Sequence, residues 1–234
     1  MFTSSTLTRS RHDVNIAEMS QARDAYHHGD LRNALVASAA RLIEASGPQA
    51  FSLREAAREV GVSANAAYRH FDDKSALMSA VAADGHARLA MKMRRAMDAT
   101  TAGRSGARAV ARFQAVGRAY VEFAIEHPSI FRVMFGEWGA ARRSAKPAET
   151  PAETPWTLLG ESLDALVHEG VLPAERRPGA ELKAWTVVHG FASLTLDGLA
   201  AAPTRRERAA MLESLLDFAV LGLCGEVRAP RQER

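Results

Sequence analysis

Apolar residues recur at helical spacing along most of this 234-residue chain. From Asp30 onward they repeat every three or four positions and stop at Gly47-Pro48, which predicts a helix with one buried side and an aspartate N-cap. A second periodic stretch runs from Asp72-Asp73 to about Met97, and a third from Val110 to His127-Pro128. Because β-branched residues are sparse as well, the pattern predicts an all-α protein.

The C-terminal part of the chain contains three further helical patterns, at residues 156–169, 180–199 and 205–223. The last two are apolar around much of their circumference, and such helices need a second surface to bury against. We therefore expect a partner subunit, with the chain forming a homodimer. Before these helices the tetrad Pro-Ala-Glu-Thr occurs twice in succession, which predicts a flexible loop over residues 140–155.

Two short helical patterns in the N-terminal part are joined by a tight turn. Ser52 and Glu55 predict a capping box at the start of the first helix, and Gly61 can adopt the left-handed conformation that ends it. Ser63 then caps a second helix that continues to about His70. Together with the upstream helix this is a tri-helical helix-turn-helix, which lays its second element in the major groove of DNA. On spacing alone, a generic helical hairpin is an equal alternative.

Particular sequence segments make the DNA-binding interpretation more specific. The segments FSLREAA (51–57), GVS (61–63) and YRHFDDKSAL (68–77) resemble the DNA-binding domain of TetR-family transcriptional regulators. This resemblance covers residues 26 to about 85. The segment YHHGDL (26–31) resembles one branch of that family, and WTVVHG (185–190) resembles its WHG-type sensor domain.

The resemblance implies a three-part organisation. Residues 1–25 are expected to be a flexible N-terminal arm, either solvated or in contact with phosphates. Residues 26–88 are the expected helix-turn-helix domain, with its recognition unit at about 52–71. Residues 89–228 are the expected helical-bundle domain for ligand sensing and dimerisation, in which an effector would shift the helix at about 72–97.

Residue chemistry and the family motif together predict the DNA contacts. Side chains at helix starts and ends can reach phosphate oxygens, whereas the front of the second helix faces base edges. Arg54 is a further candidate, with pairing to a carboxylate as its alternative. The predicted phosphate contacts are Ser52, Tyr68, His70 and Lys74, and the predicted base-facing residues are Ser63, Ala64, Asn65 and Ala67.

Asn65 departs from the family pattern, which usually has a small residue there. Its amide can donate a hydrogen bond to adenine N7 and accept one from adenine N6, so it is a candidate for adenine readout. A bond to a phosphate or a water is the alternative. Charges balance over residues 52–74, so we expect tight binding to require two copies on a roughly palindromic double-stranded DNA operator.

Aromatic and methionine side chains of the C-terminal domain are the candidate ligand contacts, although most are expected to pack in the core. They suggest an apolar or aromatic effector. His189 and Gly190 are assigned to structure or to the dimer contact, where Gly190 would allow close helix approach. The candidate ligand contacts are Phe113, Tyr120, Phe123, His127, Phe131, Met134, Phe135, Trp138, Trp156 and Trp185.

Composition narrows the class of protein. The net charge of +3 is compatible with nucleic acid but does not establish it. A single cysteine, no leader-like start and no apolar run of membrane length indicate a cytoplasmic protein. No phosphate loop, metal-ligand spacing or nucleophile elbow occurs, so we expect no enzyme, metal or cofactor. The predicted function is a transcriptional repressor released by a small effector; an activator and a non-catalytic helical adaptor are the alternatives.

Overall fold

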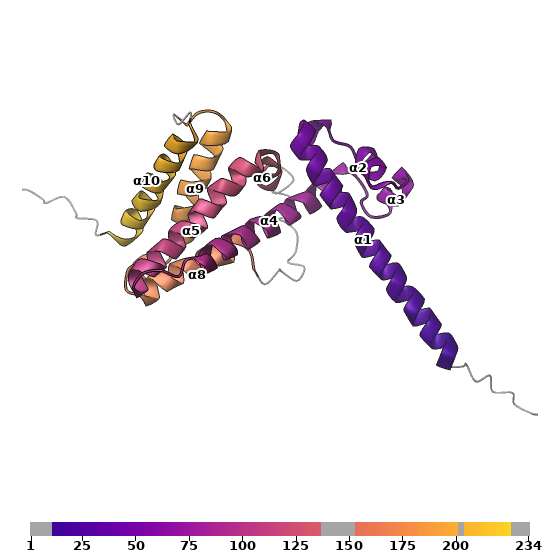
Figure 1. Ribbon diagram of the computed structural model, residues 1–234, viewed down its shortest axis with the longest axis horizontal. Coiled ribbons are helices and arrows are strands. Elements are labelled where there is room, and N and C mark those ends of the chain that lie inside the picture. Colours follow the sequence, from indigo (N-terminus) through magenta and orange to yellow (C-terminus); the bar gives the residue numbers. More distant parts are fainter. Residues whose placement is uncertain (1–10, 137–152, 201–203, 226–234) are drawn as a thin grey trace, which may run out of the picture. The chain divides into compact units, whose positions relative to one another are not determined.

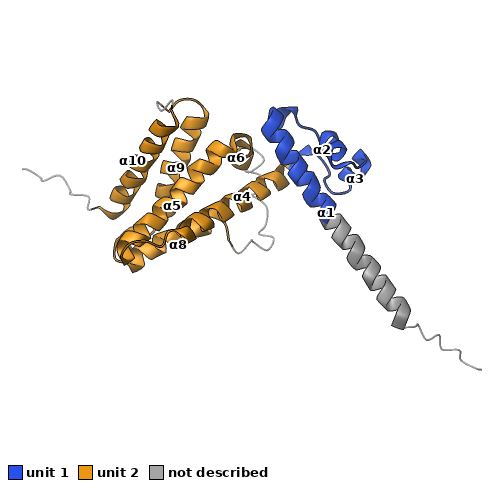
Figure 2. Ribbon diagram, viewed as in Figure 1, with its two compact units in different colours: residues 1–77 blue, residues 78–234 orange. Residues whose placement is uncertain are grey.

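The computed structural model describes residues 11–136, 153–200 and 204–225, with side chains from residue 30 onward. Every regular element in these ranges is helical (Figure 1), which confirms the prediction of an all-α protein. None of the described helices is long and apolar enough to cross a membrane. The chain divides into two compact units, residues 1–77 and 78–234, which are coloured separately in Figure 2.

The first unit is built around one long helix and two short ones. α1 packs against α2, and α2 packs against α3. Leu35, Ile43 and Phe71 are among the side chains buried between them. A fourth helix, α4, begins in this unit and continues past Leu77 into the second. The bounds are α1 (Arg11–Ala50), α2 (Leu53–Val60), α3 (Ala64–Tyr68) and α4 (Lys74–Ala99).

The start of α1 differs from the prediction, whereas its interruption agrees with it. The helix already begins at Arg11, so Asp30 is an interior residue and not the predicted N-cap. Residues 11–28 contain neither glycine nor proline and are rich in helix formers, which lets the helix continue upstream. The backbone of the arm predicted at 1–25 is therefore helical from Arg11 on, and residues 1–10 lie outside the described residues. At Gly47 the backbone leaves the helical region, with φ 80° and ψ 162°.

The second unit is a bundle in which α5 is the central helix. α5 contacts α6, α8, α9 and α10, and ten of its 22 residues are buried. The predicted loop at 140–155 ends earlier than expected because Pro155 is the first residue of α8 and Thr154 is its N-cap. Residues 140–152 of that loop lie outside the described residues. The bounds are α5 (Ser105–Glu126), α6 (Pro128–Phe135), α8 (Pro155–His168), η1 (Ala174–Arg176), α9 (Ala180–Leu196) and α10 (Arg205–Cys224).

At Gly85, α4 and α6 approach each other closely. A Cβ atom added there would lie 2.7 Å from the Met134 sulfur and 2.9 Å from Cγ2 of Ile130. Both neighbours are fully buried, and the Ile130 methyl is attached to a branched β-carbon that moves only with the whole side chain. The two helices therefore require glycine at this position.

Gly85→Ala is expected to lower the free energy of unfolding by about 1–2 kcal/mol, because overpacking outweighs the roughly 1 kcal/mol that alanine contributes in a helix. Denaturant unfolding followed by circular dichroism measures this change. The matched control is Gly160→Ala in α8, where the added Cβ would lie 3.6 Å from its nearest neighbour and stability should stay equal or rise. Equal stability of the Gly85 variant would show that Met134 and Ile130 can move aside.

Candidate functional site

The turn between α2 and α3 has the predicted geometry, with one difference in its capping. The Ser52 hydroxyl accepts a hydrogen bond from the Glu55 amide at 3.2 Å, but the Glu55 carboxylate accepts from that same hydroxyl at 3.0 Å and not from the Ser52 amide. Gly61 is left-handed, with φ 81° and ψ 24°. The Ser63 hydroxyl caps α3 by accepting from the Ala66 amide at 3.2 Å. The corner that positions α3 is therefore fixed by local hydrogen bonds.

α3 presents only some of the predicted side chains to the outside. Ser63, Asn65 and Tyr68 are exposed, and Ala64 is half-buried. Ala67 is 0% exposed, so the prediction that it faces base edges is wrong. Its methyl group lies on the inner side of the helix, where the small side chain allows α3 to pack closely onto the unit.

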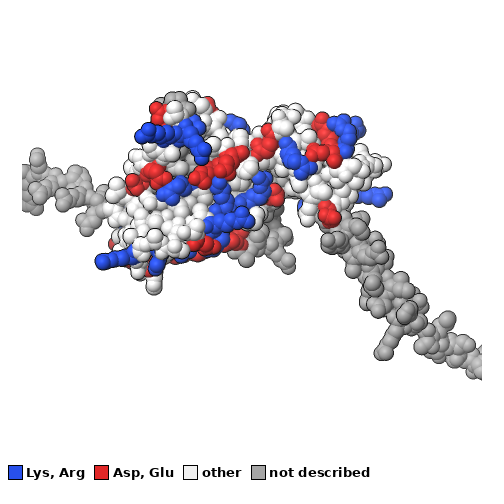
Figure 3. Space-filling view, viewed as in Figure 1, with Lys and Arg blue, Asp and Glu red and all other residues white. Residues whose placement is uncertain are grey.

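The predicted phosphate contacts differ in how many partners their side chains already have within the protein. Lys74 donates to the Gln49 carbonyl at 3.2 Å and lies over the Phe51 ring, so its ammonium group has partners within the unit. Ser52 is engaged in its cap, and His70 is half-buried. Arg54 is exposed. On the face drawn in Figure 3, acidic and basic side chains are interspersed.

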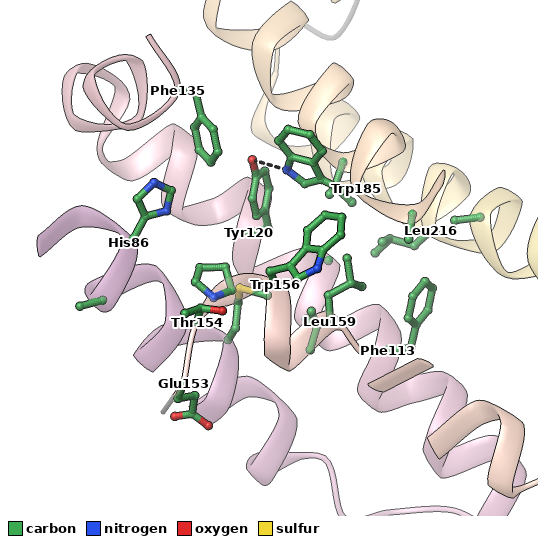
Figure 4. Close-up of a pocket in the computed structure, with 18 of the residues that line it drawn as sticks. His86, Phe113, Tyr120, Phe135, Glu153, Thr154, Trp156, Leu159, Trp185 and Leu216 are labelled. Atoms are coloured by element: carbon green, nitrogen blue, oxygen red, sulfur yellow. Dashed lines mark hydrogen bonds between the residues drawn. The ribbon is translucent and has the colours of Figure 1, made fainter. Parts of the chain in front are cut away.

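The second unit contains a pocket of about 500 Å³. Its lining comes from α4, α5, α6, α8, α9 and α10, together with Glu153 and Thr154 just before α8. Figure 4 shows aromatic rings from four helices around it. The volume lies in the usual range for small-molecule sites.

Five of the ten predicted ligand contacts line this pocket: Phe113, Tyr120, Phe135, Trp156 and Trp185. Four others, Phe123, His127, Phe131 and Met134, do not line it. Phe123, Phe131 and Met134 are buried, and the His127 ring stacks on Phe123 while Nε2 lies 3.0 Å from the Arg88 guanidinium. Trp138 lies outside the described residues.

Sequence reasoning missed the small residues that make room for the pocket. Ala83 and Ala87 line it from α4, and Gly117 lines it from α5. A Cβ atom at Gly117 would lie 2.5 Å from Cδ2 of Leu216 and 3.3 Å from Cγ1 of Val188. His86 was also missed, and its ring packs edge-on against Phe135. A glycine inside an apolar helix was the one signal that pointed to this region.

Three side chains form a hydrogen-bonded group at the pocket wall. Trp185 Nε1 donates to the Tyr120 oxygen at 3.0 Å, drawn as the dashed line in Figure 4, and His189 Nδ1 lies 2.8 Å from that oxygen. Burial raises the pKa of Tyr120 and lowers the pKa of His189, so both groups favour their uncharged forms. His189 thus positions Tyr120, in keeping with the structural role predicted for it.

Gly190 does not have the predicted function within a single chain. A Cβ atom added there would meet no other atom within 4 Å, so no helix of the same described chain approaches closely at this point. Its neighbourhood on α9 is instead an outer surface. Leu182 and Leu194, two turns before and one turn after it, are both exposed.

Glu153 is the carboxylate of the pocket wall, and it is held by an arginine. Arg94 Nε donates to Glu153 at 2.5 Å, and the same guanidinium donates to both oxygens of Glu161. Hydrogen bonding to Arg94 lowers the pKa of Glu161. Arg94 therefore joins α4 to both the start and the first turns of α8. Among the described residues no cluster of histidine, cysteine and carboxylate side chains could hold a metal ion.

Both units resemble known protein families. Residues 35–81 match the family described as bacterial regulatory proteins, tetR family, and residues 113–219 match the tetracyclin repressor-like C-terminal domain. No curated protein is detectably similar to this chain.

Solved structures are similar over most of the chain. A protein of unknown function from Rhodococcus sp. RHA1 is 31% identical, with 85% of this chain and 98% of that chain covered and a TM-score of 0.60. A TetR-family regulator from Pectobacterium atrosepticum is 20% identical, covering 87% and 98%, with a TM-score of 0.61. A substituted TetR from Acinetobacter baumannii AYE in complex with minocycline is 21% identical, covering 80% and 93%, with a TM-score of 0.55.

His189→Asn is expected to reduce the loss of thermal stability on acidification. Because burial lowers the folded-state pKa of His189 from its ordinary 6.5, the unfolded chain takes up the proton first as the pH falls. The stability that depends on the neutral ring is complete above about pH 6.5 and declines below it. Asparagine keeps an acceptor near the Nδ1 position but does not titrate.

Melting temperatures at about pH 7.5 and about pH 5.5 measure the effect. The difference between the two should be smaller for His189→Asn than for the parent. His168→Asn, at an exposed position on α8, is the matched control and should retain the parent difference. An unchanged difference in His189→Asn would contradict this account of the buried imidazole.

Proposed function

Because this chain belongs to the TetR family of DNA-binding transcriptional regulators, we propose that it represses transcription from a palindromic operator as a homodimer. A small, largely apolar effector releases it by entering the pocket of the second unit. Binding to chromosomal DNA requires that it act in the cytoplasm. The finer resemblance of residues 185–190 to the WHG-type sensor domain remains a prediction.

The observation that carries this proposal is the aromatic pocket in the unit that does not contain the helix-turn-helix. A cavity of about 500 Å³ with few polar groups suits a drug-sized apolar molecule. The similar TetR from Acinetobacter baumannii is in complex with minocycline, which supports a small-molecule site in this kind of domain. No group in the pocket is arranged as nucleophile and base, which fits a binding site.

α4 is the element through which we propose that the effector acts. Its first residues, Lys74–Leu77, belong to the DNA-binding unit, and Ala83, His86 and Met93 of the same helix line the pocket. An effector that binds one arrangement of α4 more tightly than another shifts the population toward that arrangement. The effector then lowers the affinity for the operator by some factor, and the operator lowers the affinity for the effector by that same factor.

The exposed apolar stripe on α9 and α10 supports the homodimer. The two helices pack against each other, yet large apolar side chains remain on their outer side. On α10, Met211, Phe218 and Leu221 follow helical spacing, and the last two are 63% and 70% exposed. On α9, Gly190 lies between Leu182 and Leu194 with open space over it. A second copy of the same two helices would cover this surface, with Gly190 allowing close approach between subunits.

Asn65→Ala is expected to remove preference for one symmetric adenine in the operator, by roughly 5- to 150-fold per site, because alanine cannot pair with the adenine edge. In-vitro selection of genomic DNA fragments, followed by titration of single-base operator variants at several salt concentrations, measures this. Asn33→Ala, an exposed asparagine on α1, is the control and should keep the parent preference. Unchanged preference in Asn65→Ala would assign that side chain to a phosphate or water. Failure of the parent to enrich any palindrome would overturn the operator proposal.

Phe218→Glu is expected to weaken the dimer by at least roughly 100-fold, because each subunit would bury an unpaired carboxylate in the apolar interface. Analytical ultracentrifugation measures the dissociation constant, and operator affinity should fall in parallel. Met91→Glu replaces another exposed apolar residue, on α4, and should leave the dimer intact. A parent protein that is monomeric at concentrations where it binds its operator would contradict the homodimer.

A further inference from the structure

The polar groups of the pocket are few, and each limits the chemistry of the ligand. Among the described lining residues there is neither lysine nor arginine. An anionic ligand would therefore lose its hydration without gaining a permanently charged cationic partner, which is costly in an apolar site. Most of the remaining lining is aromatic, aliphatic or alanine side chain.

The Glu153 carboxylate in the pocket wall does not require a cationic ligand as its partner. Glu153 already accepts a hydrogen bond from Arg94 Nε at 2.5 Å, within a group that also includes Glu161. Arg94 already offsets much of the Glu153 charge, so a ligand ammonium would gain less by pairing with this carboxylate than with an unpaired one. The pocket therefore favours uncharged molecules over ions of either sign.

The Tyr120 hydroxyl has one hydrogen-bonding position left. The Trp185 indole can only donate, so the Tyr120 oxygen accepts from it at 3.0 Å. For the bond between Tyr120 and His189 Nδ1, 2.8 Å apart, we assign the hydrogen to the phenol, because a phenol is a stronger donor than a neutral imidazole N–H and an unprotonated imidazole nitrogen is the stronger acceptor. The oxygen then retains one lone pair, which can accept a hydrogen bond but has no hydrogen to give.

The surrounding rings favour a flat molecule at this end of the pocket. Trp156 and Trp185 meet edge to face, with centroids 6.4 Å apart and an interplanar angle of 80°. Phe135 lies 6.1 Å from Trp185 on the other side. Figure 4 shows Tyr120 among these rings. A planar ring system can stack on one of them while its edge meets another.

We propose that the pocket takes an uncharged aromatic molecule that carries a hydroxyl or N–H group, and that the oxygen of Tyr120 accepts the hydrogen of that group. This inference rests on the proposed function in so far as the molecule is the effector. Tyr120 is thereby the residue that determines specificity among aromatic ligands.

A matched series of naphthalenes tests the proposal by isothermal titration calorimetry on the full chain. The probes share one ring system and differ only in the group at one position. 2-Naphthol can donate, 2-methoxynaphthalene and 2-acetylnaphthalene can only accept, and 2-naphthoate and 2-naphthylmethylammonium are charged. 2-Naphthol should bind roughly 3- to 10-fold more tightly than the methoxy compound, as one net hydrogen bond implies. Both ions should bind at least roughly 10-fold more weakly than 2-naphthol.

Tyr120→Phe should reduce the affinity for 2-naphthol to that for 2-methoxynaphthalene. The affinity for the methoxy compound itself should not change, which also shows that the variant is folded. The control is Thr195→Val, which removes a hydroxyl on α9 that bonds to the Phe191 carbonyl and does not line the pocket. That variant should keep the parent ratio between the two probes.

Three results would overturn the proposal: tighter binding of 2-acetylnaphthalene than of 2-naphthol, tightest binding of a charged probe, or binding of none of the series. Operator binding, measured on the same preparations with and without 2-naphthol, separates this inference from the proposed function. Discrimination among probes without any change in operator binding would support the ligand class and contradict the effector role. Operator binding without discrimination among the naphthalene probes would support the proposed regulator and contradict the proposed ligand class.

Discussion

The packing of α5 is the constraint on which the second unit depends. α5 is covered by α6, α8, α9 and α10, so its side chains must fill the space between several helices at once. Large side chains at Phe113 and Tyr120 do so at two points, and Gly117 between them lets Leu216 and Val188 pack closely against α5 beside the pocket. Interiors are normally packed without voids, so a cavity of this size beside a central helix indicates a space kept for another molecule.

The same constraint explains why the polar groups of the pocket are paired internally. A carboxylate or a phenol next to apolar rings would be costly if it lacked a partner. Glu153 has Arg94, and Tyr120 has Trp185 and His189. Burial keeps the tyrosine and the histidine uncharged, so the wall needs no ion from solvent. A ligand therefore meets a surface whose hydrogen bonds are already oriented, and only unused positions can select among ligands.

The sequence predicted the local features of the fold better than the pocket. The caps at Ser52 and Ser63 and the turn at Gly61 depend on neighbouring residues, and local spacing reveals them. The burial of Ala67 could not be read in this way, because it depends on which side of a five-residue helix faces α2. Likewise, Phe113 and Phe123 both belong to the apolar pattern of the same helix, α5, so the sequence gives no reason to assign them different roles. Which of the two lines the pocket depends on the helices that pack around α5, and local spacing does not show this.

The shortness of α3 limits what one subunit can read. With Ala67 committed to packing and Ala64 half-buried, the exposed polar groups near the helix start are those of Ser63 and Asn65. Few base contacts and balanced local charge give one subunit little discrimination between sites. Joining two subunits makes the second contact intramolecular and multiplies the preference of the first. In the proposed homodimer the exposed stripe on α9 and α10 would thus be as necessary to operator recognition as α3 itself, because without it Asn65 would act on only one half-site.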